Sequence, residues 1–301
     1  MKFFSIVLIC DDKHFKYTNV TITSVIKNSN PKFHYEFNIL SEYISPKNQA
    51  KAQKQLAKYR NVSIKFIELK NIDKSKFFLN FYFPVSTYYR FYIPEVFKDY
   101  DRILYLDGDL IVDYDISELA EMDFEDKLAI CCPSPYIHNI IKNGGTEKFP
   151  ISYFKETLGI ENPAEYFNTG VMAYNLKKIN EKNLFSKFFE ALEHIKEPKL
   201  LDQDILNSVF SQNGGVKLIS QKYNNTRGFK ITHNRLIINR IKRFFRIMDK
   251  DKLFYIYHYV GKNKPWNTKR PDDILFYFYA KKSPFYKEIL KENQQKTKKK
   301  T

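Results

Sequence analysis

The chain has 301 residues, of which 43% are hydrophobic and 17% aromatic, so it can bury the core of one large domain or of one domain with a tail. The net charge is +16, and residues 221–301 carry all of it, with 22 lysines and arginines against 6 aspartates and glutamates. A basic segment of this kind favours anionic partners such as membrane headgroups, nucleic acid or acidic polymers. No apolar stretch is long enough to span a membrane, which argues against a transmembrane protein.

The N-terminal segment and the cysteines bear on where the protein acts. The apolar run over residues 3–10 is short, Asp11 and Asp12 follow it at once, and no small-residue cleavage site is present. We therefore expect a buried first strand and not a signal peptide. The three cysteines have neither disulfide nor metal-site spacing, which favours a reducing cytosol.

Alternating apolar and amphipathic runs predict an α/β protein. The predicted helices run from Pro46, with Ser45 as N-cap, to about Tyr59, over Thr87–Phe97 with an interruption at Pro94, and over Asp202–Phe210. The predicted strands are Phe3–Cys10, Phe33–Leu40, Val62–Leu69, Arg102–Asp107, Leu128–Cys132, one within Tyr166–Leu176, Val216–Ser220, and Leu253–Val260. This alternation predicts a mixed, mostly parallel sheet, and such sheets bind ligands outside the carboxyl ends of their strands.

The last part of the chain has a weaker pattern. Asn234–Met248 places apolar and cationic residues on opposite faces of a predicted helix. Residues 272–280 are rich in aromatic side chains, and the charge run 296–301 is expected to be disordered. This segment has two interpretations: it docks on an anionic surface, or it is only solvated.

Two carboxylates follow an apolar strand at Asp107 and Asp109. In extended backbone, residues i and i+2 point to the same side, so both can face one ligand. Asp-x-Asp alone is a common turn sequence, but here apolar runs flank it on both sides. Burial of two carboxylates is costly unless a cation or hydrogen-bond donors compensate. Hard oxygen ligands favour Mn²⁺ or Mg²⁺, and such an ion in turn binds a diphosphate.

Further polar clusters have both a structural and a functional interpretation. His258 lies in an apolar run and could be a core residue, or a metal ligand beside carboxylates. Gly261 and Lys264 follow it and could form a turn or contact a phosphate. Three more clusters have the same two kinds of interpretation. Leu201–Asn207 could be a helix cap, Phe167–Gly170 a turn, and Tyr88–Arg90 a site with only a surface charge. Alternatively, all three could contact the sugar or the phosphates of a substrate.

Six short segments stand out together: Ile9–His14 (ICDDKH), Thr87–Phe91 (TYYRF), Arg102–Val112 (RILYLDGDLIV), Tyr166–Leu176 (YFNTGVMAYNL), Leu201–Asn207 (LDQDILN) and His258–Trp266 (HYVGKNKPW). In this order they resemble glycosyltransferase family 8, which contains bacterial lipopolysaccharide α-galactosyl- and α-glucosyltransferases. The resemblance implies a GT-A fold over residues 1–266, followed by a basic tail over 267–301. It also implies a retaining, Mn²⁺-dependent transfer of hexose from UDP-galactose or UDP-glucose to a lipid-linked glycan, with Mg²⁺ as an alternative ion.

The resemblance also assigns residues. It implies that the metal ligands are Asp107, Asp109 and His258. It implies a uracil contact at Asp11, with Asp12 beside it, and diphosphate contacts at Gly261 and Lys264. It implies donor-sugar contacts at Arg90, Asn168, Asp202 and Gln203, with Gln203 near the anomeric carbon. Two departures from the family are Lys13, where a small polar residue is usual, and Ala129–Pro135, where no aspartate is present.

A retaining reaction has two schemes. A double displacement requires a carboxylate nucleophile, for which Asp202 or Asp204 is available. Because Gln203 is a poor nucleophile, we favour attack by the acceptor hydroxyl on the same face that the leaving phosphate occupies. We expect action at the inner face of the cytoplasmic membrane and no nucleic-acid partner. The alternatives are a cationic nucleic-acid-binding or glycan-binding protein without catalysis, and self-glucosylation.

Overall fold

The structure is a computed structural model that describes residues 1–70, 72–78, 84–226, 254–268, 270 and 273–298. The predicted amphipathic helix Asn234–Met248 lies outside these residues. Among the described residues, no helix combines the length and the apolar composition that crossing a membrane requires.

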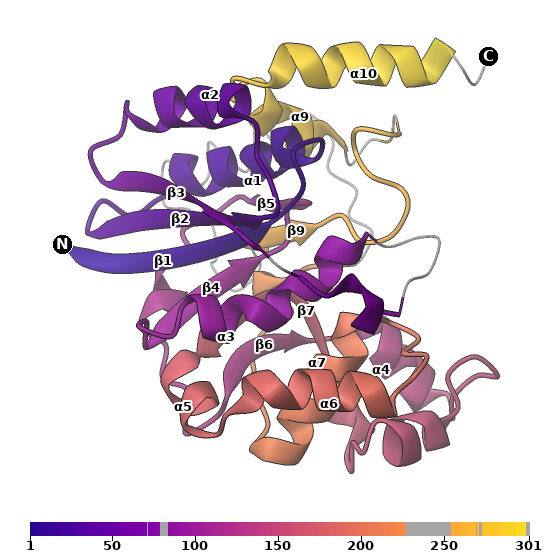
Figure 1. Ribbon diagram of the computed structural model, residues 1–301. Coiled ribbons are helices and arrows are strands. Elements are labelled where there is room, and N and C mark those ends of the chain that lie inside the picture. Colours follow the sequence, from indigo (N-terminus) through magenta and orange to yellow (C-terminus); the bar gives the residue numbers. More distant parts are fainter. Residues whose placement is uncertain (71, 79–83, 227–253, 269, 271–272, 299–301) are drawn as a thin grey trace, which may run out of the picture.

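A seven-stranded sheet forms the centre of the molecule, in the order β3-β2-β1-β4-β7-β6-β8 (Figure 1). Only β7 runs against its neighbours, so the sheet is mixed and mostly parallel, as predicted. Its strands are β1 (Lys2–Ile9), β2 (Phe33–Ser41), β3 (Val62–Glu68), β4 (Arg102–Leu106), β6 (Ala129–Pro133), β7 (Phe167–Asn175) and β8 (Lys217–Leu218). The polar residues after β1 and β4 therefore lie at the same edge of the sheet.

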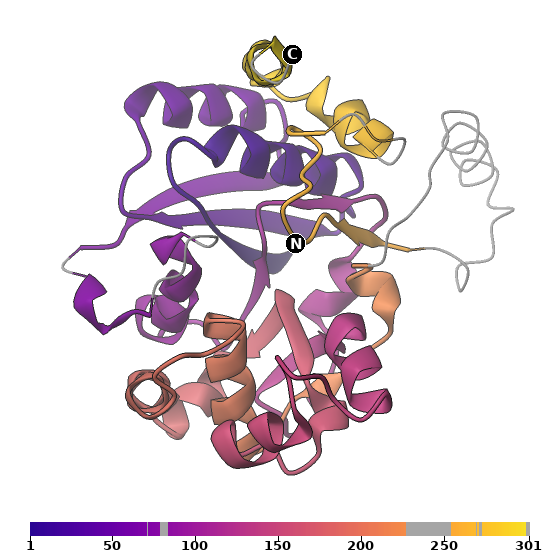
Figure 2. The same cartoon turned by 90° about the vertical axis from the view of Figure 1, so that its right-hand side faces the viewer.

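Helices cover both faces of the sheet (Figures 1 and 2). Alternate side chains of β4 enter different cores: Leu104 and Leu106 pack with the first helix, whereas Ile103 and Tyr105 pack with the helices of the opposite face. The helices are α1 (Phe15–Lys27), α2 (Pro46–Leu56), α3 (Ile93–Val96), α4 (Pro135–Lys142), α5 (Leu176–Glu181), α6 (Leu184–His194), α7 (Asp202–Asn213), α9 (Asp273–Ala280) and α10 (Tyr286–Lys298).

A second, two-stranded sheet joins distant parts of the chain. Strand β5 (Leu110–Val112) pairs antiparallel with β9 (Ile256–His258), and in this register Leu110 lies opposite His258. The α1 side chains support β5 directly: the Thr21 hydroxyl donates to the Leu110 carbonyl at 2.8 Å, and the Val112 N–H donates to Ser24 at 2.9 Å. The pairing brings His258 beside the two aspartates that precede β5.

Several predicted elements differ in detail. Thr87–Phe97 forms a 3₁₀ helix, η2 (Val85–Tyr92), followed by α3, whose second residue is Pro94. Proline fits there because the first turn of a helix lacks an intrahelical N–H partner. The strand predicted over Val216–Ser220 is only Lys217–Leu218. At the C-terminus, α10 continues to Lys298, so the backbone of residues 296–298, predicted to be disordered, is helical.

The aromatic C-terminal segment packs against the N-terminal helices (Figure 2). Phe285 is fully buried and lies edge-on to Phe15, with ring centroids 5.6 Å apart. Trp266 stacks on Tyr17 at 4.0 Å. Lysines of α1 and α2 pair with two α10 glutamates, Glu292 and Glu288. The division of the chain at residue 266 stays a prediction, but α9 and α10 share a core with α1.

Candidate active site

The site forms where the polar ends of several elements meet. Asp11 and Asp12 follow β1, and Asp107 follows β4. Because β7 runs in the reverse direction, its first residues lie at this same edge, and the Asp107 N–H donates to the Gly170 carbonyl at 2.9 Å. These polar residues therefore lie together outside the carboxyl ends of the parallel strands, where sheets of this kind bind ligands.

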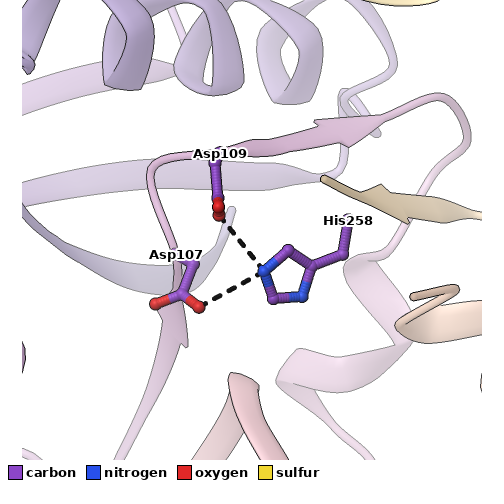
Figure 3. A group of neighbouring side chains, drawn as sticks. All are labelled: Asp107, Asp109 and His258. Atoms are coloured by element: carbon purple, nitrogen blue, oxygen red, sulfur yellow. Dashed lines mark ion pairs between the residues drawn. The ribbon is translucent and has the colours of Figure 1, made fainter. Parts of the chain in front are cut away.

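Asp107, Asp109 and His258 converge on one point, with one ligand atom of each within 4.8 Å of the others (Figure 3). Nε2 of His258 lies 3.4 Å from Oδ2 of Asp107 and 3.2 Å from Oδ1 of Asp109. Nδ1 on the far side of the ring donates to Oδ1 of Asn224 at 2.9 Å. With its proton on Nδ1, neutral imidazole directs the lone pair of Nε2 at the two carboxylates.

Two observations show that these residues fit a cation. Oδ1 of Asp109 is buried and has no hydrogen-bond donor, although it faces Nε2 of His258. An acceptor facing an acceptor is unfavourable unless a cation or a proton lies between them. Gly170 also lines this point, since a Cβ there would lie 2.3 Å from Cε1 of His258. Two carboxylates and one imidazole form a mixed set of oxygen and nitrogen ligands that suits a divalent cation.

Lys264 lies beside the same group. Its ammonium forms an ion pair with Asp109 and donates to the Tyr259 carbonyl at 2.7 Å. Burial opposes ionisation of Asp109, but the positive charge of Lys264 prevails and holds the pKa of this carboxyl far below its usual range. Gly261 has φ +78°, a left-handed conformation that favours glycine, and a Cβ would meet no atom there. Both residues remain predicted diphosphate contacts.

Arg90 is buried and joins two carboxylates. Its Nη2 donates to Oδ1 of Asp107 at 3.1 Å, and its Nε lies 2.8 Å from Oδ2 of Asp202. Nη1 donates to the Thr169 hydroxyl at 2.7 Å, and the guanidinium stacks over the Tyr105 ring at 4.6 Å. The predicted role of Arg90 is a donor-sugar contact; in the structure its guanidinium pairs with the buried Asp202 and the half-buried Asp107.

The first turn of α7 carries Asp202, Gln203 and Asp204. Burial raises the pKa of Asp202 to about 7, against the opposing effect of Arg90. Burial also raises the pKa of Asp204, which accepts hydrogen bonds from Tyr153 at 2.6 Å and Tyr166 at 2.5 Å. Oε1 of Gln203 accepts a hydrogen bond from Nδ2 of Asn168 at 3.0 Å, so the predicted donor-sugar contacts on α7 and β7 touch each other.

The aspartates after β1 have local partners. Oδ1 of Asp12 accepts from the Ser45 N–H and hydroxyl, both at 2.9 Å, and from Nδ2 of Asn48 at 2.7 Å. Asp12 therefore anchors the start of α2. Asp11 is exposed and accepts from the His14 N–H at 2.7 Å. Their roles at the nucleoside stay predictions.

The sequence did not indicate the roles of three residues of the site. Asn224 contacts His258 and Asn168, Gly170 lies against the ring of His258, and Tyr166 lies between Gln203 and Asp204. Gly170 and Tyr166 fall inside Tyr166–Leu176, one of the six segments that resemble the family, so their place in that segment could have marked them as site residues. Asn224 lies in a polar stretch without any pattern that distinguishes it.

Comparisons with known proteins identify the class. Residues 5–270 match the family described as Glycosyl transferase family 8. The lipopolysaccharide 1,2-glucosyltransferase of Escherichia coli is 28% identical over 82% of this chain and 68% of its own length. The lipopolysaccharide 1,3-galactosyltransferase of Salmonella typhimurium is 26% identical over 90% of this chain and 76% of its own length. The galactosyltransferase LgtC, solved with donor and acceptor sugar analogues, superposes with a TM-score of 0.68 at 25% identity, covering 97% of this chain and 95% of that one.

The fold is therefore the GT-A type of glycosyltransferases. The chain belongs to glycosyl transferase family 8, which confirms the predicted resemblance.

Proposed function

We propose that the protein is a retaining hexosyltransferase that transfers glucose or galactose from a UDP-sugar to a lipid-linked glycan of the lipopolysaccharide or lipooligosaccharide core. The names of its relatives support this acceptor class and both hexoses. The observation that carries the proposal is the convergence of Asp107, Asp109 and His258, with Nε2 of the histidine directed at two carboxylates.

These three residues would hold Mn²⁺, with Mg²⁺ as the alternative. A divalent ion there supplies positive charge that stabilises the departing diphosphate. Lys264 adds a second positive charge at the same place and, with the backbone at Gly261, would contact the phosphates. Arg90 keeps Asp107 in place from the side opposite the histidine.

For the transfer itself we favour attack of the acceptor hydroxyl on the face that the diphosphate leaves. Both oxygens of Asp204 accept hydrogen bonds, and Asp202 pairs with Arg90, so neither carboxylate is an unengaged nucleophile. The leaving phosphate then accepts the proton of the attacking hydroxyl, and Gln203 lies beside the reacting carbon. A sugar found covalently attached to Asp202 or Asp204 during turnover would replace this scheme by a double displacement.

The basic C-terminal charge supports a position at the inner face of the cytoplasmic membrane, where a lipid-linked acceptor lies. Sedimentation with vesicles tests this. We expect binding to vesicles that contain anionic lipid, weakened by salt, and little binding to neutral vesicles. Equal binding to both kinds would exclude electrostatic docking.

The donor and the metal are tested together by UDP release from a panel of UDP-sugars, with Mn²⁺ and with EDTA. We expect Mn²⁺-dependent release from UDP-glucose or UDP-galactose, and its loss in Asp109→Asn. The exposed Asp99 lies before the start of β4, at the end of the strand away from the site, and provides the matched control. Asp99→Asn should retain wild-type release. Release that EDTA does not affect would contradict the metal assignment, and release from neither hexose would contradict the donor.

A further inference from the structure

A continuous chain of side-chain hydrogen bonds connects His258 to Asp204. Nδ1 of His258 donates to Asn224 at 2.9 Å, and Nδ2 of Asn224 donates to Oδ1 of Asn168 at 2.7 Å. Nδ2 of Asn168 donates to Oε1 of Gln203 at 3.0 Å, and Nε2 of Gln203 donates to the Tyr166 hydroxyl at 3.3 Å. Tyr166 donates to Asp204. Every bond points the same way, from the imidazole to the carboxylate.

Backbone donors determine the direction of this chain. The Gly170 N–H donates to Oδ1 of Asn168 at 3.0 Å, and the Thr169 N–H donates to Oε1 of Gln203 at 3.3 Å. An amide side chain accepts only through its oxygen, so reversing either one would place its NH₂ group against a backbone N–H. With Asn168 oriented in this way, its oxygen requires the NH₂ group of Asn224. The oxygen of Asn224 is then left to accept from His258.

Both ends of the chain are buried, and so is Asn224. His258 is 4% exposed, and Asp204 and Asn224 are 0% exposed, so water does not replace a lost partner easily. A reversed chain would leave Oδ1 of Asp204 without its tyrosine donor and would direct an NH₂ group at Nδ1 of His258. The proton of the neutral imidazole would then lie on Nε2, facing Asp107 and Asp109, where it would exclude a metal ion.

We propose that Asn224 is a positioning residue of the active site. It keeps the Nδ1 proton of His258 in place, so that Nε2 remains a ligand, and through Asn168 it sets the orientation of the Gln203 amide. This inference rests on the proposed function, because it concerns the metal ligand and the residue beside the reacting carbon. Asn224 thus couples metal binding to the orientation of Gln203.

Two substitutions separate the two halves of this role. Asn224→Ala removes the acceptor of the Nδ1 proton, so we expect Mn²⁺ affinity, measured by electron paramagnetic resonance without donor, to fall about 10- to 100-fold. Asn224→Asp keeps that acceptor but cannot donate to Asn168. We expect its Mn²⁺ affinity to stay within about threefold of wild type, while kcat for UDP release falls about tenfold or more because Gln203 is misoriented.

A spectroscopic measurement reports on the imidazole without any metal. In protein labelled with ¹⁵N-histidine, the Nδ1–H of His258 should give a slowly exchanging signal, assigned by its absence in His258→Gln. We expect this signal to persist in Asn224→Asp and to disappear through exchange in Asn224→Ala. Asn38→Ala is the control for loss of a buried asparagine, since Asn38 is also 0% exposed and its side chain, within the described part of the chain, donates to Ile6 and Glu36, away from the site.

The outcomes distinguish this inference from the proposed function. If Asn224→Ala binds Mn²⁺ as wild type does while Asp109→Asn does not, the positioning role is wrong and the metal site stands. If Asn224→Asp loses Mn²⁺ affinity as severely as Asn224→Ala, the acceptor role is wrong. If wild type and Asp109→Asn bind Mn²⁺ alike, the proposed metal site fails, and the Nδ1–H signal still tests the bond between Asn224 and His258.

Discussion

Gly170 lies directly against His258: a Cβ added to this glycine would be 2.3 Å from Cε1 of the ring and 2.7 Å from Oδ2 of Asp107. Both distances are far below van der Waals contact. The first residues of β7 therefore form one wall of the candidate metal site, and only a residue without a side chain leaves room for the ring and the carboxylate together.

Substitution of Gly170 should disrupt the site by steric exclusion. In Gly170→Ala the added methyl group must displace the ring of His258 or the carboxylate of Asp107, so we expect Mn²⁺ affinity to fall about tenfold or more. Calorimetric titration with Mn²⁺ measures this. Gly144→Ala is a useful comparison because a Cβ there meets no atom, although φ is +81°. It should cost about 1–2 kcal/mol of stability and leave Mn²⁺ affinity unchanged. Wild-type affinity in Gly170→Ala would refute the packing argument.

Arg90 should prove to be a stabilising counter-ion. Arg90→Met leaves the buried Asp202 carboxylate without its partner, and we expect a loss of about 3–5 kcal/mol in the free energy of unfolding. Replacing the unpaired carboxyl as well, in Arg90→Met/Asp202→Asn, should recover more than about 1 kcal/mol relative to the sum of the single changes. Urea denaturation of the four proteins gives this coupling. Strictly additive losses would show that the pair does not interact.

The same variants test the predicted contact between Arg90 and the donor sugar. If the KM for the donor is higher in the double variant than in Asp202→Asn alone, Arg90 contacts the substrate in addition to pairing with Asp202. If the two KM values agree, the role of Arg90 is only to neutralise the carboxylates.

The contribution of Asp12 should depend on pH in a defined direction. Burial opposes its ionisation, but donors from Ser45 and Asn48 prevail and lower its pKa below the ordinary value of 3.8. A lowered pKa in the folded state means that ionised Asp12 stabilises the fold above the ordinary pKa, and that this contribution is lost as pH falls through the folded pKa. The stability difference between wild type and Asp12→Asn, from urea curves, should therefore shrink below about pH 4. A difference that stays constant down to pH 2 would contradict this.

The C-terminal helices should contribute to the core. Phe285 is fully buried against α1, so Phe285→Ala should lower the free energy of unfolding by about 3–5 kcal/mol. Phe3→Ala, at a side chain that is 72% exposed, should change it by less than about 0.5 kcal/mol. Thermal or urea unfolding measures both. If the two substitutions had equal small effects, the C-terminal segment would not share the core.

The sequence indicated the elements whose pattern is local. An apolar strand before Asp107 and the spacing of Asp107 and Asp109 were sufficient to predict a carboxylate pair at a strand end, because residues two apart in extended backbone share a side. The sequence did not indicate α1. Its run of valine, threonine and isoleucine has a low helix propensity, and the helix is stabilised by burial and by hydroxyl contacts such as Thr21 to the backbone of β5.

By itself, the amino-acid sequence determined the class of fold, the family and the chemical nature of the candidate ligands, since each of these depends on short segments with their own spacing. Only the tertiary structure decided which atoms face one another. His258 reaches Asp109 because β9 pairs with β5, and Asn224 reaches His258 because the next residue, Asn225, forms a parallel bridge with Tyr257 of β9. Hydrogen-bond direction depends on partners distant in sequence, and such partners leave no periodic pattern along the chain.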